Sequence, residues 1–591
     1  MTDVTTAVDE PTGTDVPDGP DTAPRRTFGQ WLRDRDRREL LAWILLLAIA
    51  IFLRVYDLGS RAFHHDESQD AYFSYLFSKD WGSYQYDPLL HGPLRFLLTA
   101  FNYTIFGDSN FTARLAPAYM GVIAVGLPYL IRKDIGRVAA FAAGVMLCVS
   151  PSFLYFSRFA REDIYLATLM FAVIVACFRF INRPRTATLC LVFALAALSF
   201  AMKEAGLVMD GLIALYFMIA AVVQGVRSER FLDAPVIKAV RSVGAAAWVS
   251  ATATLVITYS AMFTMFFSQG HMTARLGPPD APIGVEKPSI DAIYYGLDYW
   301  HGQQSVARGS DKPWLYTSIL IGNEWPIVLL AFVGLYATIR KPTLFRAFAC
   351  FYFAGTMAFY CWGSERFAWL VLHPLLPLIL MAGIGVGHLW TLRSKVARIA
   401  SAVAVAIGFA YLVTASYVAN ATEGTDPASM LVSTQSSSQV AQVAREVVAL
   451  DKEYRKTHKV GLTITVDQAQ GATFPYAWYF RHLSAGYPDV QTTPPASQVE
   501  IMTEEAHTAQ LPALQAYDCR QFDFRVWWVK DYSKQGLSTW WKWFTKRTPW
   551  DTTGGLKEWF CLRRDVGPLP GKNVTTDNPP PAPPAPAPAS G

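Results

Sequence analysis

Long apolar blocks separated by short charged segments constrain the fold of this chain more than any other feature. The chain has 591 residues, of which 52% are hydrophobic and only 17% are charged. A hydrocarbon core roughly 30 Å thick is crossed by about 20 apolar residues in a helix, which is the length of most of these blocks. The sequence therefore predicts a polytopic α-helical membrane protein, with spans at residues 39–57, 113–131, 137–156, 163–180, 186–202, 205–224, 243–267, 315–339, 343–362, 367–389 and 397–418.

The connecting loops predict the orientation. Basic residues collect in alternate loops, at positions 132–137, 179–185, 227–241, 340–346 and 393–398, and by the positive-inside rule these loops and the N-terminus face the cytoplasm. The alternation holds only if the short apolar segment His91–Phe106 does not cross the bilayer. We therefore expect this segment to be an outer juxtamembrane helix, leaving about eleven spans in a multi-pass protein of the plasma membrane.

Composition divides the chain into four regions. Residues 1–30 predict a disordered cytoplasmic tail and 567–591 a disordered Pro/Ala-rich tail. Residues 31–422 form the transmembrane domain, with outer loops at 58–112 and 268–313. Residues 423–566 predict an extracytoplasmic α/β domain, with a helical pattern at 439–454 and strands at 460–466 and 524–529. Cys519 and Cys561 lie in polar surroundings there, so they are candidates for a disulfide.

The outer loops carry an unusual density of charged side chains. Asp66 and Glu67 follow two histidines, His64 and His65, directly after the first span, which suits general-base or metal chemistry. Carboxylates and guanidinium groups from separate loops could converge at this surface, where arginine matches phosphate oxygens in a bidentate manner. The further candidates are His91, Arg114, Arg158, Arg161, Asp163, Lys203 and Arg366.

Simpler interpretations compete with these roles. Asp66 and Glu67 could be solvated loop charges, and Arg158, Arg161 and Asp163 fit an interfacial salt bridge as well as a phosphate site. Lys203 and Glu204 are equally well explained as a local ion pair. A divalent metal is compatible with the residue types, but no ligand spacing specifies one. No organic cofactor is expected, and no aromatic-basic patch indicates nucleic acid.

The order of these features resembles the GT-C superfamily of membrane glycosyltransferases, especially protein O-mannosyltransferases and lipid A aminoarabinose transferases. The matching positions are Arg54, Asp66-Glu67, His91-Gly92-Pro93-Leu94, Phe106-Gly107, Arg114-Leu115, Asp163, Met202-Lys203 and Ser364 to Pro377. Two motifs, His-His-Asp-Glu-Ser and Asp-Pro-Leu-Leu-His-Gly-Pro-Leu, look closer to a subgroup known from archaeal N-glycosylation as a flippase-activity-associated protein. One departure is Leu90, where aminoarabinose transferases carry an acidic residue that can ligate metal.

The resemblance implies a GT-C fold, a sugar donor linked to polyprenyl phosphate and an active site at the outer membrane face. The acceptor would be an extracytoplasmic protein, lipid or glycan. The catalytic candidates are then Asp66, Glu67 and Asp163. The candidates for binding the donor phosphate are Arg158, Arg161, Lys203 and Arg366. The candidates for binding the rest of the substrate are His65, His91 and Arg114. Two alternatives stay open: a non-catalytic transporter or flippase-associated protein for a lipid-linked sugar, and a polysaccharide ligase using a diphosphate carrier.

Overall fold

The structure is a computed structural model, and it describes residues 37–81, 86–267, 273–275, 284–286, 290–310, 312–422, 424–490, 494–528 and 534–571. The predicted tail at 1–30 and nearly all of the predicted tail at 567–591 lie outside the described residues. So does most of the first half of the predicted outer loop at 268–313, where the strands β1 (Thr273–Arg275) and β2 (Gly284–Glu286) form a short antiparallel pair.

Long apolar helices make up the first two thirds of the chain. Within the described residues, eight helices are long and apolar enough to cross a membrane, or nine if the bent pair α7 (Arg137–Val149) and α8 (Pro151–Ser157) is one span. Helix α5 (Asn110–Gly126) continues through short turns to Ile135, and the remaining seven are α9 (Glu162–Asn182), α11 (Ala205–Arg227), α13 (Ala245–Phe263), α15 (Leu315–Arg340), α16 (Leu344–Trp362), α17 (Leu372–Trp390) and α18 (Lys395–Tyr417).

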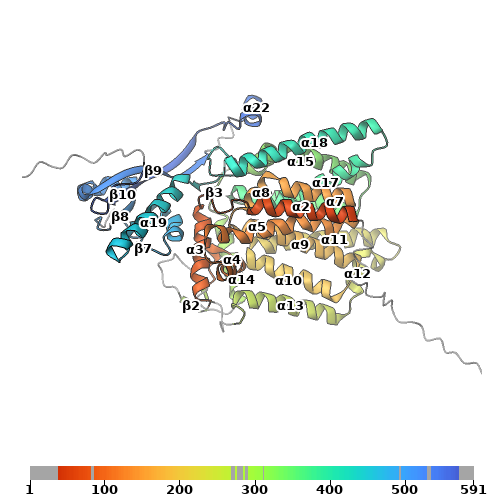
Figure 1. Ribbon diagram of the computed structural model, residues 1–591. Helices are drawn as coiled ribbons and strands as arrows, with labels where there is room; N and C mark the ends of the chain where they lie inside the picture. The colour runs from red at the N-terminus through yellow and green to blue at the C-terminus, as the bar shows by residue number, and fades with distance from the viewer. Residues whose placement is uncertain are drawn as a thin grey trace, which may run out of the picture. The chain divides into compact units, whose positions relative to one another are not determined.

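Two other predicted spans coincide with helices that are shorter or more charged. These are α2 (Arg37–Val55), which carries basic residues at both ends, and α10 (Thr186–Met202). The prediction of a polytopic helical protein is confirmed, whereas the number eleven stays a prediction. Figure 1 shows α9, α10, α11 and α13 running side by side, with α10 packed against each of the other three.

The segment predicted to lie along the membrane is short in the structure. After the turn η1 (Pro88–Leu90), helix α4 (Leu94–Phe106) has 13 residues and so extends only about 20 Å at 1.5 Å per residue. That is too short for the hydrocarbon core. The helix packs between α3 (His65–Lys79) and α5.

Helix breaks place polar side chains inside the helical region. Pro151 begins α8 after a bend of 58° from α7, and its ring fits the first turn of a helix, where no amide partner is needed. In α15, Glu324 has a non-helical backbone (φ −119°, ψ 17°) two residues before Pro326. The Glu324 carboxylate accepts hydrogen bonds from the Ser150 hydroxyl and the Ser152 amide, so the two breaks meet.

A mixed sheet of six strands dominates the last third of the chain, in the order β5-β9-β10-β8-β6-β7. The strands are β5 (Gln435–Ser436), β6 (Thr463–Val466), β7 (Ser484–Gly486), β8 (Val499–Thr503), β9 (Tyr517–Trp528) and β10 (Thr553–Arg563). β6 pairs in parallel with β7 and β8, and the other pairs are antiparallel. The helices of this region are α19 (Ser438–His458), α20 (Thr473–Tyr479), α21 (Glu504–Gln510) and α22 (Leu537–Lys546).

The core of this sheet region follows from its amphipathic patterns. One face of α19, with Val440, Val443 and Val447, packs with Ile464, Phe524 and other buried strand residues. Cys519 of β9 and Cys561 of β10 lie opposite each other in the register and form a disulfide. The expected α/β character and the candidate disulfide are both found.

Candidate active site

Helix α3 begins at the His64 to Glu67 cluster, and the cluster itself forms the cap. The His64 side chain accepts a hydrogen bond from the Asp66 amide at 3.0 Å, while the Glu67 carboxylate accepts one from the His64 amide at 3.1 Å. This reciprocal arrangement is a capping box, here with histidine as the N-cap. Because the cap fixes the first turn, Asp66 and Glu67 point in different directions.

Glu67 is completely enclosed, and its partner is Arg114 of α5. Arg114 donates from Nε and Nη2 to the two Glu67 oxygens, each at 2.8 Å, and the Ala160 amide donates to Oε1 at 2.8 Å. Burial opposes ionisation, but Arg114, Arg61 and the Ala160 amide outweigh it and lower the pKa of Glu67 to about 2. Glu67 therefore ties α3, α5 and the loop before α9 together.

Arg114 has no donor left for a substrate. Besides Glu67, its guanidinium donates to the backbone oxygens of Leu58, Arg61 and Ala62, so all five N–H groups are satisfied. The side chain is 0% exposed. The Arg114 guanidinium is thus occupied by Glu67 and backbone carbonyls, and the assignments of Arg114 to substrate binding and of Glu67 to catalysis stay predictions.

Asp66 is the more open carboxylate of the pair. Its side chain is 24% exposed and lies 3.6 Å from Nη2 of Arg161 and 3.9 Å from Nδ1 of His64. Burial would raise the pKa of Asp66, but Arg161, His64 and His65 together lower it to about 2. Asp66 is therefore an ionised carboxylate that is still partly exposed.

Arg161 connects Asp66 to a buried ionic network around Glu162, the first residue of α9. The Glu162 carboxylate lies 3.1 Å from Arg161, 2.7 Å from Arg95 and 3.1 Å from Lys203, and it is 0% exposed. Arg95 also lies 2.8 Å from Asp70 of α3. Sequence reasoning missed Glu162, although its place between Arg161 and Asp163 was a signal that a second acid begins the same helix.

Asp163 and Lys203 meet at the next position of the network. Nζ of Lys203 donates to Asp163 at 3.1 Å, and Nε2 of His373 lies 3.1 Å from the same oxygen. The structure thus brings together Asp66, Arg161, Asp163 and Lys203, which come from three separate segments: the start of α3, the start of α9 and the end of α10.

His91 links this network to a second acid. Its Nδ1 lies 2.7 Å from Glu204 and its Nε2 3.3 Å from Glu162. Burial alone would lower the pKa of His91, but the two carboxylates raise it, so both ring nitrogens act as donors. His91 has a left-handed φ of 59°, and a side chain at the next residue, Gly92, would collide with the Ala201 carbonyl.

A cavity of about 570 Å³ opens beside His91, Lys203 and Glu204. Trp300 of α14 (Ile290–Gln303) lines it and stacks on the His91 ring, with centroids 4.6 Å apart. Asp298 and Glu365 are the other acids in the described wall, and the remaining wall is rich in aromatic side chains: Tyr294, Phe359, Tyr360 and Trp362. Lys203 and the protonated His91, next to aromatic walls, suit a ligand with a phosphate and an apolar or sugar portion.

Three other predicted site residues lie apart from this network. Arg158 donates to the carbonyls of residues 53, 54, 56 and 57 and so caps the end of α2. His65 accepts from Nη2 of Arg525 at 2.7 Å, on the side of the sheet. Arg366 lies in the short strand β4 (Glu365–Arg366), which pairs with β3 (Arg308–Gly309), and it donates to the Cys361 carbonyl at 3.1 Å.

Metal-ligand side chains come together elsewhere. In the described part of the chain, the three groups of His507, Cys519 and Cys561 lie within 4.8 Å of one another. The two sulfurs form a disulfide, so thiolates would be available to a metal only after reduction.

The fold is similar to that of two solved structures of ArnT. ArnT from Cupriavidus metallidurans in the apo state is similar over 90% of this chain and 100% of its own, with 16% identity and a TM-score of 0.55. ArnT bound to undecaprenyl phosphate is similar over 89% of this chain and 99% of its own, with 15% identity and a TM-score of 0.56.

Residues 90–237 match the family described as dolichyl-phosphate-mannose-protein mannosyltransferase. A comparison with curated proteins found no matching sequence. The likeness to ArnT and the family match over residues 90–237 both agree with the multi-pass membrane fold that the sequence predicted. The narrower likeness to a flippase-associated subgroup stays a prediction.

Proposed function

We propose that the protein transfers a sugar from a polyprenyl-phosphate donor to an acceptor at the extracytoplasmic face of the membrane. The observation that carries this proposal is the ionised, partly exposed Asp66 joined through Arg161 to a buried network that ends at Lys203, in the wall of the 570 Å³ cavity. The family match to a mannosyltransferase that uses dolichyl phosphate mannose, and the ArnT complex with undecaprenyl phosphate, support the donor class.

The reaction needs one base and one stabiliser of negative charge. An acceptor hydroxyl attacks the anomeric carbon, its proton passes to Asp66, and the bond from that carbon to the phosphate oxygen breaks. The polyprenyl phosphate leaves with the electron pair, and Lys203 and Arg161 stabilise its charge. An ammonium group has three donors, and Glu162 and Asp163 can occupy two of those on Lys203, so one can serve the phosphate.

Other residues of the site, predicted and newly found, take positioning roles in this proposal. Asp163 holds Lys203, while Glu162 holds Lys203, Arg161 and Arg95 together. His91 and Trp300 shape the cavity for the donor. Arg366 is a second phosphate candidate, because its neighbour Glu365 lines the same cavity. The orientation with a cytoplasmic N-terminus belongs to the same proposal.

Replacing the base tests the catalytic assignment. Asp66→Asn should reduce sugar transfer from a supplied polyprenyl-phosphate sugar by at least about 100-fold, since general-base catalysis contributes that much. Binding of the donor should be largely retained. Asp80→Asn, at the opposite and exposed end of α3, is the matched control and should transfer normally. Retained transfer by Asp66→Asn would refute the role.

The non-catalytic alternative predicts a different result. A transporter would move a labelled lipid-linked sugar between leaflets of vesicles that contain no acceptor, and Asp66→Asn would not stop that movement. Movement of this kind, without transfer when acceptor is added, would favour the transporter over the enzyme.

A divalent metal is not needed for the charge stabilisation that we propose. Arg95, Arg161 and Lys203 already lie within 3.1 Å of Glu162 and supply the positive charge that a metal would bring. We therefore expect transfer to continue after treatment with a chelator such as EDTA. Loss of transfer with EDTA and recovery with added Mg²⁺ or Mn²⁺ would assign a metal to Asp66, the most exposed carboxylate of this network.

A further inference from the structure

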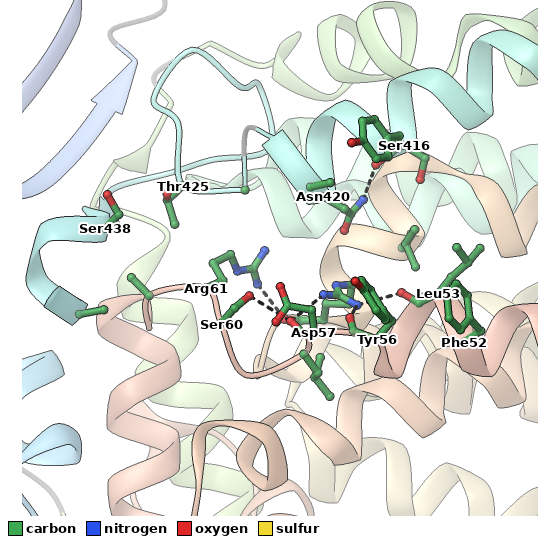
Figure 2. Close-up of a pocket in the computed structure, with 18 of the residues that line it drawn as sticks. Phe52, Leu53, Tyr56, Asp57, Ser60, Arg61, Ser416, Asn420, Thr425 and Ser438 are labelled. Carbon is green, nitrogen blue, oxygen red and sulfur yellow. Dashed lines mark hydrogen bonds between the residues drawn. The ribbon is translucent and has the colours of Figure 1, made fainter. Parts of the chain in front are cut away.

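A second large cavity lies at the end of helix α2, away from the candidate active site. It has a volume of about 590 Å³ and is enclosed by α2 and the loop after it, α8, α18 and the start of α19. Figure 2 shows Phe52 and Leu53 on α2, Ser60 and Arg61 on the loop, and Ser416 and Asn420 across from them. This cavity shares no lining residue with the 570 Å³ cavity, so it is a separate site.

One end of the cavity is strongly basic. Arg61, Arg158 and Arg445 line it, and Asp57 is the only acid among the described residues of the wall. Arg158 is fixed by four backbone carbonyls, and Arg61 donates to the Arg158 carbonyl at 2.8 Å while lying 4.5 Å above the Tyr155 ring. Two guanidinium groups are therefore held in place before any ligand binds.

The excess of positive charge is also visible in the ionisation of these groups. Burial, followed by the positive charges of Arg61 and Arg114, lowers the pKa of Arg158 to about 10. Arg445 is exposed on α19 and forms no hydrogen bond or ion pair with the described part of the chain. An anion bound here would relieve this repulsion and gain a partner for Arg445.

The other end of the cavity is apolar. Phe52, Leu53, Val149, Leu154 and Val413 form its wall. Phe52 on α2 is 60% exposed, and most of the apolar stretch of α18 is not buried within the protein. Helices α2 and α18 therefore present apolar surface next to the cavity. In a membrane protein such surface faces hydrocarbon chains.

Two polar groups in the wall have no hydrogen-bond partner within the described ranges of the chain. They are Oγ of Ser416, a residue that is 4% exposed, and Oδ1 of Asn420. Nδ2 of Asn420 donates to the Ser416 carbonyl at 2.9 Å, which fixes the side chain and leaves its oxygen as an acceptor. Buried polar groups are normally satisfied, so these two indicate a ligand with polar atoms between the basic and apolar ends.

We propose that this cavity binds a membrane lipid with a phosphate-bearing headgroup, at a site distinct from the one where sugar transfer occurs. The phosphate lies between Arg61 and Arg445, the polar linkage meets Ser416 and Asn420, and the hydrocarbon chain follows α2 and α18. The phosphate chemistry is shared by a glycerophospholipid and by a polyprenyl phosphate, and the experiment must separate these two sources.

Native mass spectrometry of the full-length protein in detergent tests the site. Wild-type protein is titrated in separate arms with phosphatidylglycerol, undecaprenyl phosphate and inorganic phosphate, and compared with Arg445→Glu. We expect the variant to bind the lipid that occupies this cavity at least about tenfold more weakly, because it loses a charge-assisted contact and gains repulsion. Lys452→Glu, on the exposed surface of α19 and outside the cavity, makes the same charge change and should bind normally.

A second variant blocks the apolar half without changing charge. Ser416→Phe should fill the space beside Asn420 and reduce lipid binding by a similar factor. Loss of phosphatidylglycerol in both variants identifies a membrane phospholipid, and loss of undecaprenyl phosphate identifies the carrier. Equal lipid binding by wild type and both variants would overturn the proposal, and so would binding of inorganic phosphate alone. None of these results depends on whether Asp66 catalyses transfer.

Discussion

Arg161 shows how one side chain sets the chemistry of its neighbours. It lies 3.6 Å from Asp66 and 3.1 Å from Glu162, and it is the largest single contribution that opposes the effect of burial on Asp66. Asp66 therefore stays ionised at every pH in which a membrane enzyme is usually assayed. Arg161 lies between Asp66 and the buried Glu162, and its positive charge keeps the pKa of Asp66 low.

Removing this guanidinium should change the pH dependence of transfer. In Arg161→Gln, burial is no longer opposed by the nearest cation, so the pKa of Asp66 should rise from about 2. The base is then protonated at higher pH, and the acid limb of kcat/KM should move upward. Wild-type protein should show no limb from Asp66 above pH 4. The measurement is kcat/KM for transfer between pH 4 and 8, and an unchanged profile would mean that Arg161 does not control the base.

The environments of Glu162 and Glu67 could not be predicted from the sequence. The sequence pointed to the region that forms the network, because charged residues beside apolar spans are costly and therefore rare. It could not tell which of two adjacent acids faces outward, since that depends on the helical phase of α3 and on Arg114, 47 residues away. Glu162 was passed over because its four cationic partners come together only in the fold.

At the scale of elements, α3 carries the proposed base, Asp66, and also a buried ion pair that attaches the helix to α5. Its first turn is held by the His64 cap and by the pair of Glu67 with Arg114, both buried. Under our proposal, adjacent residues of one helix have separable roles: Asp66 takes part in catalysis, and Glu67 attaches α3 to α5. That separation can be measured with two conservative substitutions.

Glu67→Gln should destabilise the protein, and Asp66→Asn should not. Loss of the Glu67 charge leaves Arg114 buried without its ionic partner, which typically costs about 3 to 5 kcal/mol. Thermal unfolding of the detergent-solubilised protein should therefore show a clearly lower Tm for Glu67→Gln and a Tm near wild type for Asp66→Asn. Similar Tm values for the two variants would show that the Glu67 pair does not anchor α3.

The sequence predicted best the helices whose apolar residues follow one clear pattern, either a continuous apolar run or a helical repeat. The helices of the membrane region and α19 were found within a few residues, because their apolar faces are long and continuous. Strand β10 was missed: its first half, Thr553–Lys557, contains two glycines and a lysine and lacks a strand signal of its own. Pairing with β9 over its whole length supplies the structure that local propensity does not.

At the scale of the whole molecule, the C-terminal sheet region contacts the loop that carries Asp66. The Tyr479 hydroxyl accepts from the Phe63 amide at 3.0 Å, Arg481 lies 2.7 Å from Asp108, and Arg525 donates to His65. Two of these contacts, at Phe63 and His65, lie at the N-terminal end of α3, next to the His64 cap. The sheet region is therefore placed to hold the base in position, a role that no local motif in the sequence indicated.

Trp478 is the contact through which this support can be tested. It is 0% exposed, stacks on Tyr103 with centroids 5.7 Å apart, packs near Phe63, and donates from Nε1 to Asn110 at 2.9 Å. Trp478→Ala removes a large buried side chain, at a cost of about 3 to 5 kcal/mol. It also leaves α3 less constrained, so kcat for transfer should fall along with Tm.

Trp541→Ala provides the control, because Trp541 is 71% exposed on α22. Both its Tm and its kcat should stay near those of wild type. Trp478→Phe keeps most of the packing and loses only the hydrogen bond to Asn110, so it should recover most of kcat if the sheet region acts by holding α3. If Trp478→Ala instead lowers Tm while kcat per folded molecule is unchanged at low temperature, the sheet region stabilises the protein without positioning Asp66.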